Sequence, residues 1–219
     1  MRRVVYVVFN CLVLFAFSIP TSGRAQHPQV LTLDQTIDLR LQKATLMLVL
    51  GTLSVEKNIP IGIEFSANEQ YEPKLEIDVK KIPLVELLNL IVKQEPAYVW
   101  ELRDGVINFT PVVDREPFFE KLLDTQVRGF VSPKGNNKLA IRDALLNLPE
   151  IKELIRSNGL EPERLGYPHK PSIPKNDGDL SDNNTNFRSL LNKIIRESGH
   201  NSWVLQWGDK KQKTFELGF

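Results

Sequence analysis

The chain has 219 residues, 42% of them hydrophobic and 25% charged, with 28 lysines and arginines against 27 acidic residues. This balance, with no concentrated basic stripe, argues against nucleic acid as the main partner. The only cysteine is Cys11, so a disulfide framework is excluded, and a mature chain that has lost the predicted leader would have no thiolate for a metal site.

The first 25 residues have the pattern of a secretory signal peptide. Arg2 and Arg3 precede an apolar run, Val4 to Phe17, and small or polar residues then lead to a cleavage point after Ala25. An uncleaved membrane anchor is the alternative, but the run is short for a membrane span and contains Asn10. Cleavage would remove three arginines and no acidic residue, so the net charge would fall from +1 to −2. We expect an exported, periplasmic protein without a membrane span in its mature chain; secretion or inner-membrane anchoring by the leader are the alternatives.

Residues 30–113 are predicted to form a first module in the order strand, helix, strand, strand, helix, strand, strand. Alternating apolar residues indicate the strands, and Thr45 can cap the first helix. Asp104-Gly105 is a strong hairpin signal between the last two strands. The predicted elements are strand 37–42, helix 46–57, strands 61–65 and 75–80, helix 84–95, and strands 98–103 and 106–110.

The stretch Leu84–Gly105 occurs twice. Shifted by 103 residues without a gap, it aligns with Phe187–Gly208. In both copies, apolar residues at positions i, i+3, i+4, i+7 and i+8 predict an amphipathic helix that a half-buried strand follows. We infer an internal duplication. Seven of the 22 positions are identical: Leu87/Leu190, Leu88/Leu191, Asn89/Asn192, Ile91/Ile194, Trp100/Trp203, Leu102/Leu205 and Gly105/Gly208.

Residues 114–123 are predicted to be a short linker, in which Phe118 and Phe119 could pack one module on the other. Residues 124–219 are predicted to be a second, divergent module with a proline-rich insertion at 160–186. Its predicted elements are strand 127–131, helix 138–148, a further turn or helix from Pro149 to Asn158, a frayed strand near 180, helix 187–198, and strands 203–207 and 214–217. The expected fold class is α+β, with two tandem small modules whose helices pack on small mixed sheets.

The insertion contains Pro168, Pro171 and Pro174, which would lie on one edge of a polyproline II helix, as in proline-rich ligands. A stiff surface loop is the simpler interpretation. Elsewhere, the three histidines are widely separated, and no phosphate-binding loop or metal-ligand spacing occurs. We therefore expect no catalytic residue, no metal site and no cofactor.

Two stretches of the first module resemble a known family. The run TLMLVLGTLSVEKNIPIGIEF, followed by LEIDVKKIPLVELLNLIVKQEPAYVWELRDGVINFTP, resembles the secretin and TonB N-terminal short domain, with Pro83, Leu84, Leu88 and Ile91 in its P-L-x-E-x-L-x-x-L helix. The likeness covers about residues 37–111 well and 126–217 loosely. It implies a small α+β module of the bacterial envelope that meets other proteins on channels and receptors. No pore or barrel segment follows here, so we expect a free-standing protein.

Two functions follow as hypotheses. The favoured one is a non-enzymatic envelope adaptor that binds a channel, receptor or regulator, with strand addition as one mode of binding. The alternative is an envelope enzyme or small-ligand binder with a pocket between the modules, where Trp203, Trp207 and His200 would converge. Strand position makes the tryptophans more typical of a core or a module interface. The residues predicted to contact a partner are Leu75, Ile77, Val79, Pro168, Pro171, Pro174, Trp203 and Trp207.

Overall fold

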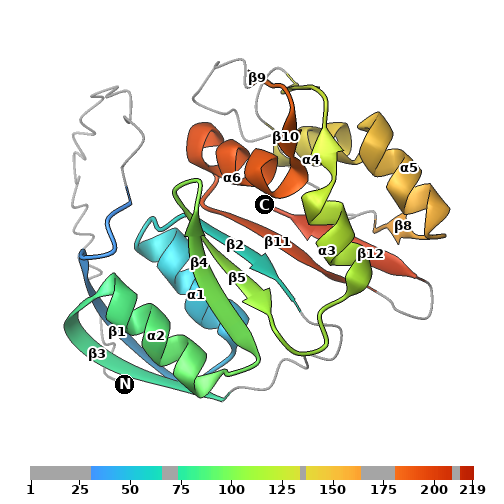
Figure 1. Cartoon of the computed structure of the whole chain (residues 1–219). Coiled ribbons are helices and arrows are strands. Elements are labelled where there is room, and N and C mark those ends of the chain that lie inside the picture. The colour runs from blue at the N-terminus through green and yellow to red at the C-terminus, as the bar shows by residue number, and fades with distance from the viewer. Residues whose placement is uncertain (1–30, 66–73, 134–136, 164–180, 209–212) are drawn as a thin grey trace, which may run out of the picture.

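A six-stranded mixed sheet joins the two halves of the chain (Figure 1). The computed structural model describes residues 31–65, 74–133, 137–163, 181–208 and 213–219. Within these residues, helices pack on small mixed sheets, so the predicted α+β class is confirmed. The strands of the central sheet are, in spatial order, β4 (Tyr98–Arg103), β5 (Val106–Pro111), β2 (Ile61–Glu64), β11 (Ser202–Trp207), β12 (Thr214–Gly218) and β8 (Glu161–Pro162).

The first half follows the predicted element order. Its remaining elements are β1 (Thr36–Ala44), α1 (Leu46–Glu56), β3 (Leu75–Pro83) and α2 (Leu84–Gln94). The side chain of Thr45 accepts the backbone N–H of Leu48 at 3.1 Å, which confirms the predicted cap. β1 and β3 pair antiparallel as a separate two-stranded sheet. α2 ends at Gln94, because Pro96 disfavours helical geometry in the residue before it.

A helix occupies most of the predicted linker. α3 (Pro117–Asp124) begins with a proline, which is favourable in the first helical turn because the N–H groups of that turn have no acceptor within the helix. The apolar residues of α3 recur at helical spacing, and Phe118 and Phe119 are buried in the core of the second half. This stretch is therefore part of the second half and not a bare connection.

The second half departs further from the prediction. The expected strand 127–131 is two short pieces, β6 (Gln126–Val127) and β7 (Phe130–Val131), and Pro149 starts a separate helix, α5 (Pro149–Ser157), after α4 (Lys138–Leu146). The frayed strand is also two pieces, β9 (Ser181–Asp182) and β10 (Thr185–Asn186), followed by α6 (Phe187–Ser198), which coincides with the predicted helix. Most of the proline-rich insertion, including Pro168, Pro171 and Pro174, lies outside the described residues.

The central sheet consists of the same three-strand unit twice. In the first unit, β4 pairs antiparallel with β5, which pairs parallel with β2; in the second, β11, β12 and β8 follow the same scheme. β2 and β11 join the units by parallel pairing, from Ser202↔Ile61 to Leu205↔Glu64. Equivalent strands therefore run in opposite directions, although their left-to-right order is the same. Such units are related by a 180° rotation about an axis that lies in the sheet, perpendicular to the strands, and by a shift along that axis. The rotation exchanges the two faces of the sheet, so the helices of the two units cover opposite faces.

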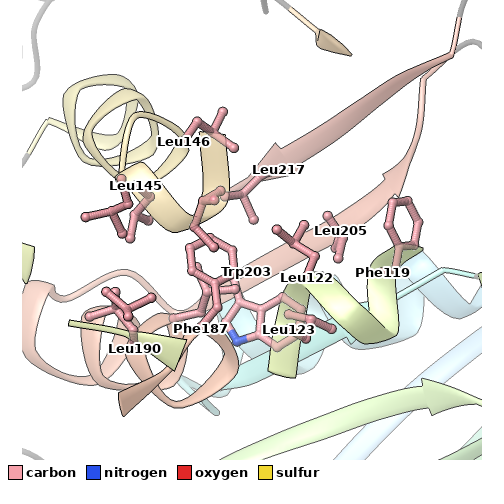
Figure 2. Close-up of a cluster of buried hydrophobic side chains, with 14 of the residues drawn as sticks. Phe119, Leu122, Leu123, Leu145, Leu146, Phe187, Leu190, Trp203, Leu205 and Leu217 are labelled. Atoms are coloured by element: carbon pink, nitrogen blue, oxygen red, sulfur yellow. The ribbon is translucent and has the colours of Figure 1, made fainter. Parts of the chain in front are cut away.

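The burial pattern agrees with this relation. One apolar cluster lies under α1 and α2 and includes Ile61, Ile107 and Phe109 of the sheet. The other lies on the opposite face, under α3 and α6, and includes Trp203, Leu205 and Phe215. Figure 2 shows side chains of α3, α4 and α6 gathered around Trp203 in the second cluster. Each unit thus has its own core, and one continuous sheet separates the two cores.

Candidate functional site

The join between the two halves is built around Trp203. The Trp203 ring is fully buried and lies against Gly62 of the paired strand β2, where a Cβ atom would overlap the indole. Its Nε1 donates to Oδ1 of Asn192 at 2.7 Å, and Nδ2 of Asn192 donates to the carbonyl oxygen of Arg103 at 3.2 Å. Nη1 of Arg196 donates to the Asp104 carbonyl oxygen at 2.8 Å. Helix α6 is therefore bonded directly to the β4–β5 hairpin of the first half.

A buried carboxylate lies beside this join. Glu64 is fully buried at the end of β2, and Arg115 contacts it through Nε at 2.9 Å and Nη2 at 3.1 Å. Arg188, from the first turn of α6, donates to Glu64 Oε2 at 3.2 Å. Arg115 has a second acid partner, Glu120, at 2.8 Å. One buried carboxylate on β2 is thus shared by two guanidinium groups, that of Arg115 from the segment between β5 and α3 and that of Arg188 from α6.

Burial and charge act differently on the two arginines. Burial lowers the pKa of Arg188, Glu64 raises it, and the positive charge of Arg115 lowers it further, so the net shift is downward. For Arg115, burial also acts to lower the pKa, but the hydrogen bond and charge of Glu64 and the charges of Glu120 and Asp124 outweigh it and raise the pKa. Arg188 is therefore the less well compensated of the two cations.

A pocket of about 280 Å³ opens next to these charges, on the face of β4 and β5 opposite α1 and α2. Asn108 and Arg188 are among its lining residues, and Oδ1 of Asn108 and Nη1 of Arg188, which are both shielded from solvent, have no hydrogen-bond partner among the described residues. Residues from both sides of the join form the walls. These are Val99, Glu101 and Arg103 of β4, Asn108 and Thr110 of β5, Arg115, Asp124 and Arg188.

The residues predicted for a pocket between the modules do not line it. Trp203 fills the core, and the Trp207 ring lies 5.2 Å from the Phe119 ring, centroid to centroid. The His200 ring lies 6.1 Å from that of Phe219. The three side chains therefore do not form the predicted pocket: Trp203 lies in the core, Trp207 packs on Phe119 of α3, and His200 lies beside Phe219.

The predicted partner surface is also largely internal. Leu75 and Ile77 of β3 are buried in the first core, and Val79 is partly buried against it. The side chains of Leu75 and Ile77 cannot contact a partner, because the face of β3 that carries them packs on the first core. Trp203 is fully buried in the second core, whereas Trp207 is half-buried.

The sequence did contain a signal for the pocket. Glu64 is the one charged residue in the apolar run from Ile59 to Phe65, and it alternates with Ile61 and Ile63, which face the first core. A charge on the other face of a short buried strand indicates that a partner of opposite charge covers it. Arg188 carries no such signal, because the helical spacing places it on the polar face of an amphipathic helix.

A second candidate site is the outer edge of β4. Within the described residues, β4 is the last strand at its end of the sheet and pairs only with β5. Val99 is 49% exposed and Leu102 is 43% exposed, one on each face of the strand. An uncovered strand edge with exposed apolar side chains is a template for pairing with another chain.

None of the helices in the described part of the chain has both the length and the apolar character needed to cross a membrane. Among the same residues, no group of three or more histidine, cysteine or acidic side chains is placed to hold a metal ion. No protein-family model matches this chain, and no curated protein or solved structure shows significant similarity to it.

Proposed function

We propose that this protein is a non-enzymatic adaptor of the bacterial envelope that binds an extended segment of a protein partner along β4. The observation that carries the proposal is the outer edge of β4, which no other strand of the described residues covers; β4 is six residues long and contains the exposed Val99 and Leu102. Export is supported by the leader-like pattern of residues 1–25. The partner would be a channel, receptor or regulator, as the resemblance to the short N-terminal domain implies.

The hairpin geometry identifies the backbone groups that such a partner would use. Asp104 and Gly105 form a two-residue turn with φ of 52° and 72°, and Arg103 pairs with Val106 across it. In such a hairpin, alternate residues bond inward, so Arg103, Glu101 and Val99 bond to β5. The N–H and C=O groups of Trp100 and Leu102 therefore point outward and are the ones that an added strand would bond.

The other strand edges are better protected, which makes β4 the favoured site. β8, at the far end of the sheet, has only two residues and contains Pro162. The β1–β3 ladder has two irregular registers, and Lys43 and Lys81 adopt positive φ beside them. Irregular registers hinder regular pairing with a further strand. β4 has neither proline nor irregular pairing.

The test replaces the outward-pointing donor at Leu102. Proline at this position removes an N–H that is not used inside the sheet, so Leu102→Pro should abolish capture of the partner from detergent-solubilised envelopes while the fold is retained. Leu102→Ala is the matched control, because it removes the side chain and keeps the N–H. Equal capture by Leu102→Pro and Leu102→Ala would exclude β4 as the binding edge.

Hydrogen exchange gives an independent readout on the complex with the captured partner. Strand addition buries the Trp100 and Leu102 amides, so the peptide that covers residues 98–103 should exchange more slowly in the complex. A complex whose only protected peptides lie elsewhere would contradict the proposal.

A further inference from the structure

Helix α1 is apolar on both sides, which sets it apart from the other helices of the described residues. Its inward side, which includes Val49 and Leu53, packs in the first core. On its outward side, Leu48 is 52% exposed and Val55 is 74% exposed. Each of the other described helices has charged residues among its exposed ones. A helix that is apolar all round is normally buried, so we expect a second surface to cover α1.

The outward side chains of α1 border a shallow groove that runs along the helix. The groove has a volume of about 410 Å³, and its lining comes from α1 and its N-cap, with Leu48, Gly51 and Val55 among the residues. At Gly51, no atom lies within 4 Å of the position that an added Cβ would take. A glycine in mid-helix lowers helix stability, but it lets a second backbone approach closely. The groove therefore suits a second helix laid along α1.

The charges at the two ends of α1 indicate which helix this is. α1 has no acidic residue in its first turn, whereas Glu56 lies exposed in its last turn. The helix dipole makes a carboxylate unfavourable at a C-terminus and favourable at an N-terminus. Glu56 and the N-cap Thr45 both line the groove and lie about three helical turns apart, on the same side at opposite ends; the C-cap Lys57 does not line it. An antiparallel copy of α1 would place its Glu56 beside Thr45, where a carboxylate is favourable.

The apolar positions have the same symmetry. Leu48 and Val55 lie on either side of Gly51, so in an antiparallel pair each Leu48 meets Val55 of the other copy. We propose that a second copy of this chain binds along α1, with the two helices antiparallel and the two-fold axis near Gly51. No residue of β4 lines the groove, so a dimer of the adaptor proposed above would carry two β4 edges, a consequence that rests on that proposal.

Sedimentation equilibrium of the full chain tests the self-association. The dimer should weaken at least about tenfold in Val55→Gln, because this change removes an apolar side chain from the contact twice. Val131→Gln is the matched control: Val131 is 71% exposed but belongs to β7, so the variant should dimerise as the unaltered chain does. A chain that stays monomeric at high micromolar concentration, or equal weakening by the two variants, would overturn the proposal.

The charge at the end of α1 tests the antiparallel arrangement. Glu56→Gln should weaken the dimer about threefold or more and make it less sensitive to salt, since two carboxylates are lost from the helix N-termini. Glu197→Gln is the control, because Glu197 is also exposed near the end of a helix, α6, but does not line the groove. A dimer that Glu56→Gln strengthens or leaves unchanged would contradict the arrangement.

Engineered cysteines report the orientation directly, in a chain that also carries Cys11→Ser. A mixture of Leu48→Cys and Val55→Cys chains should form chiefly the mixed disulfide under mild oxidation, because the two positions meet across an antiparallel pair. Preferred self-pairing of each variant would indicate a parallel pair and overturn the assignment. Protection of Gly51→Cys from a thiol reagent in a monomeric chain would show that the chain itself covers α1, which would overturn it as well.

The two proposals can fail separately. Leu102→Pro should dimerise as the unaltered chain does, while it loses the protein partner. A monomeric chain that captures a partner through β4 refutes only the dimer. A dimer through α1 with no β4-dependent partner refutes only the adaptor.

Discussion

Each copy of the duplicated helix and strand contains the same hydrogen bond, but in different surroundings. In the first copy, Nε1 of Trp100 donates to Oδ1 of Asn89 at 3.1 Å, and the tryptophan is partly exposed. In the second, Nε1 of Trp203 donates to Oδ1 of Asn192 at 2.7 Å, and both residues are fully buried. Asn192 also bonds to Arg103 of the other copy.

The comparison shows that position in the sheet, and not residue type, decides how much the tryptophan–asparagine pair contributes to stability. α2 and β4 lie at one end of the sheet, where water can replace a lost hydrogen bond. β11 lies in the middle, next to β2, so its tryptophan packs across the join. We therefore expect matched substitutions in the two copies to have unequal effects on stability.

The largest expected difference is between the tryptophans. Trp203→Ala should lower the free energy of unfolding by roughly 3 to 5 kcal/mol, because it leaves a cavity in a filled core. Trp100→Ala should cost about 1 to 2 kcal/mol, since its side chain is already partly exposed to water. Urea unfolding followed by far-ultraviolet circular dichroism measures both. Equal losses would show that the two positions are energetically equivalent.

Gly62 tests the same contact from the neighbouring strand. Gly62→Ala places a methyl group in the Trp203 ring, so we expect a loss of about 3 kcal/mol in unfolding free energy. At Gly51, exposed in the middle of α1, no atom lies within 4 Å of the position that an added Cβ would take. Gly51→Ala should therefore raise stability by about 0.5 to 1 kcal/mol. A neutral Gly62→Ala would mean that Trp203 can shift away from β2.

Substitutions of the two asparagines separate the contribution of the hydrogen bond to stability from that of tryptophan packing. Asn192→Ala leaves the buried Trp203 N–H unpaired and removes a contact to Arg103, so it should cost about 2 kcal/mol. Asn89→Ala should cost less than about 1 kcal/mol, because the Trp100 N–H can reach water. Thermal and urea unfolding of the two variants, with Asn→Asp replacements alongside, check the ranking.

The smallest effect concerns α5, which has no counterpart in the first copy. The hydrogen bond and charge of Arg156 lower the pKa of the exposed Glu153. A carboxyl group whose pKa is lowered in the folded state stabilises the fold at pH values above its ordinary pKa. This contribution is lost as the pH falls through the lowered, folded-state pKa. The stability difference between the unaltered chain and Arg156→Gln should thus be small near neutral pH and vanish in acid. A difference that grows in acid would contradict this sign.

Most of the first half could be predicted from sequence because its patterns are local. β4 and the helix starting at Leu84 follow from alternation, helical spacing and turn residues, and they lie within a residue or so of the prediction. The linker prediction missed α3, although Pro117 can start a helix and the apolar residues after it recur at helical spacing. The short strands β6, β7, β9 and β10 have too few residues to show a period.

The candidate site could not be predicted, because it depends on contacts between the copies. The pairing of β2 with β11 joins residues about 140 apart, and no local pattern specifies it. Alternation places Glu101 and Arg103 on the solvent side of a half-buried strand, and only the placement of α3 and α6 over that side makes a pocket. The duplicated Asn192 and Trp203 were visible as identities, but their contact was not.

Pro162 makes the two outer edges of the central sheet unequal. The half-turn and shift that relate the two units do not close on themselves, so a third unit could in principle add beside β8 as β11 adds beside β2. The N–H groups of Glu161 and Glu163 donate inward, to the carbonyl oxygens of Lys213, just before β12, and of Phe215 on β12. The residue between them faces outward and, being proline, has no N–H to offer. Within residues 161–163, this edge of the sheet therefore offers an added strand no backbone N–H group.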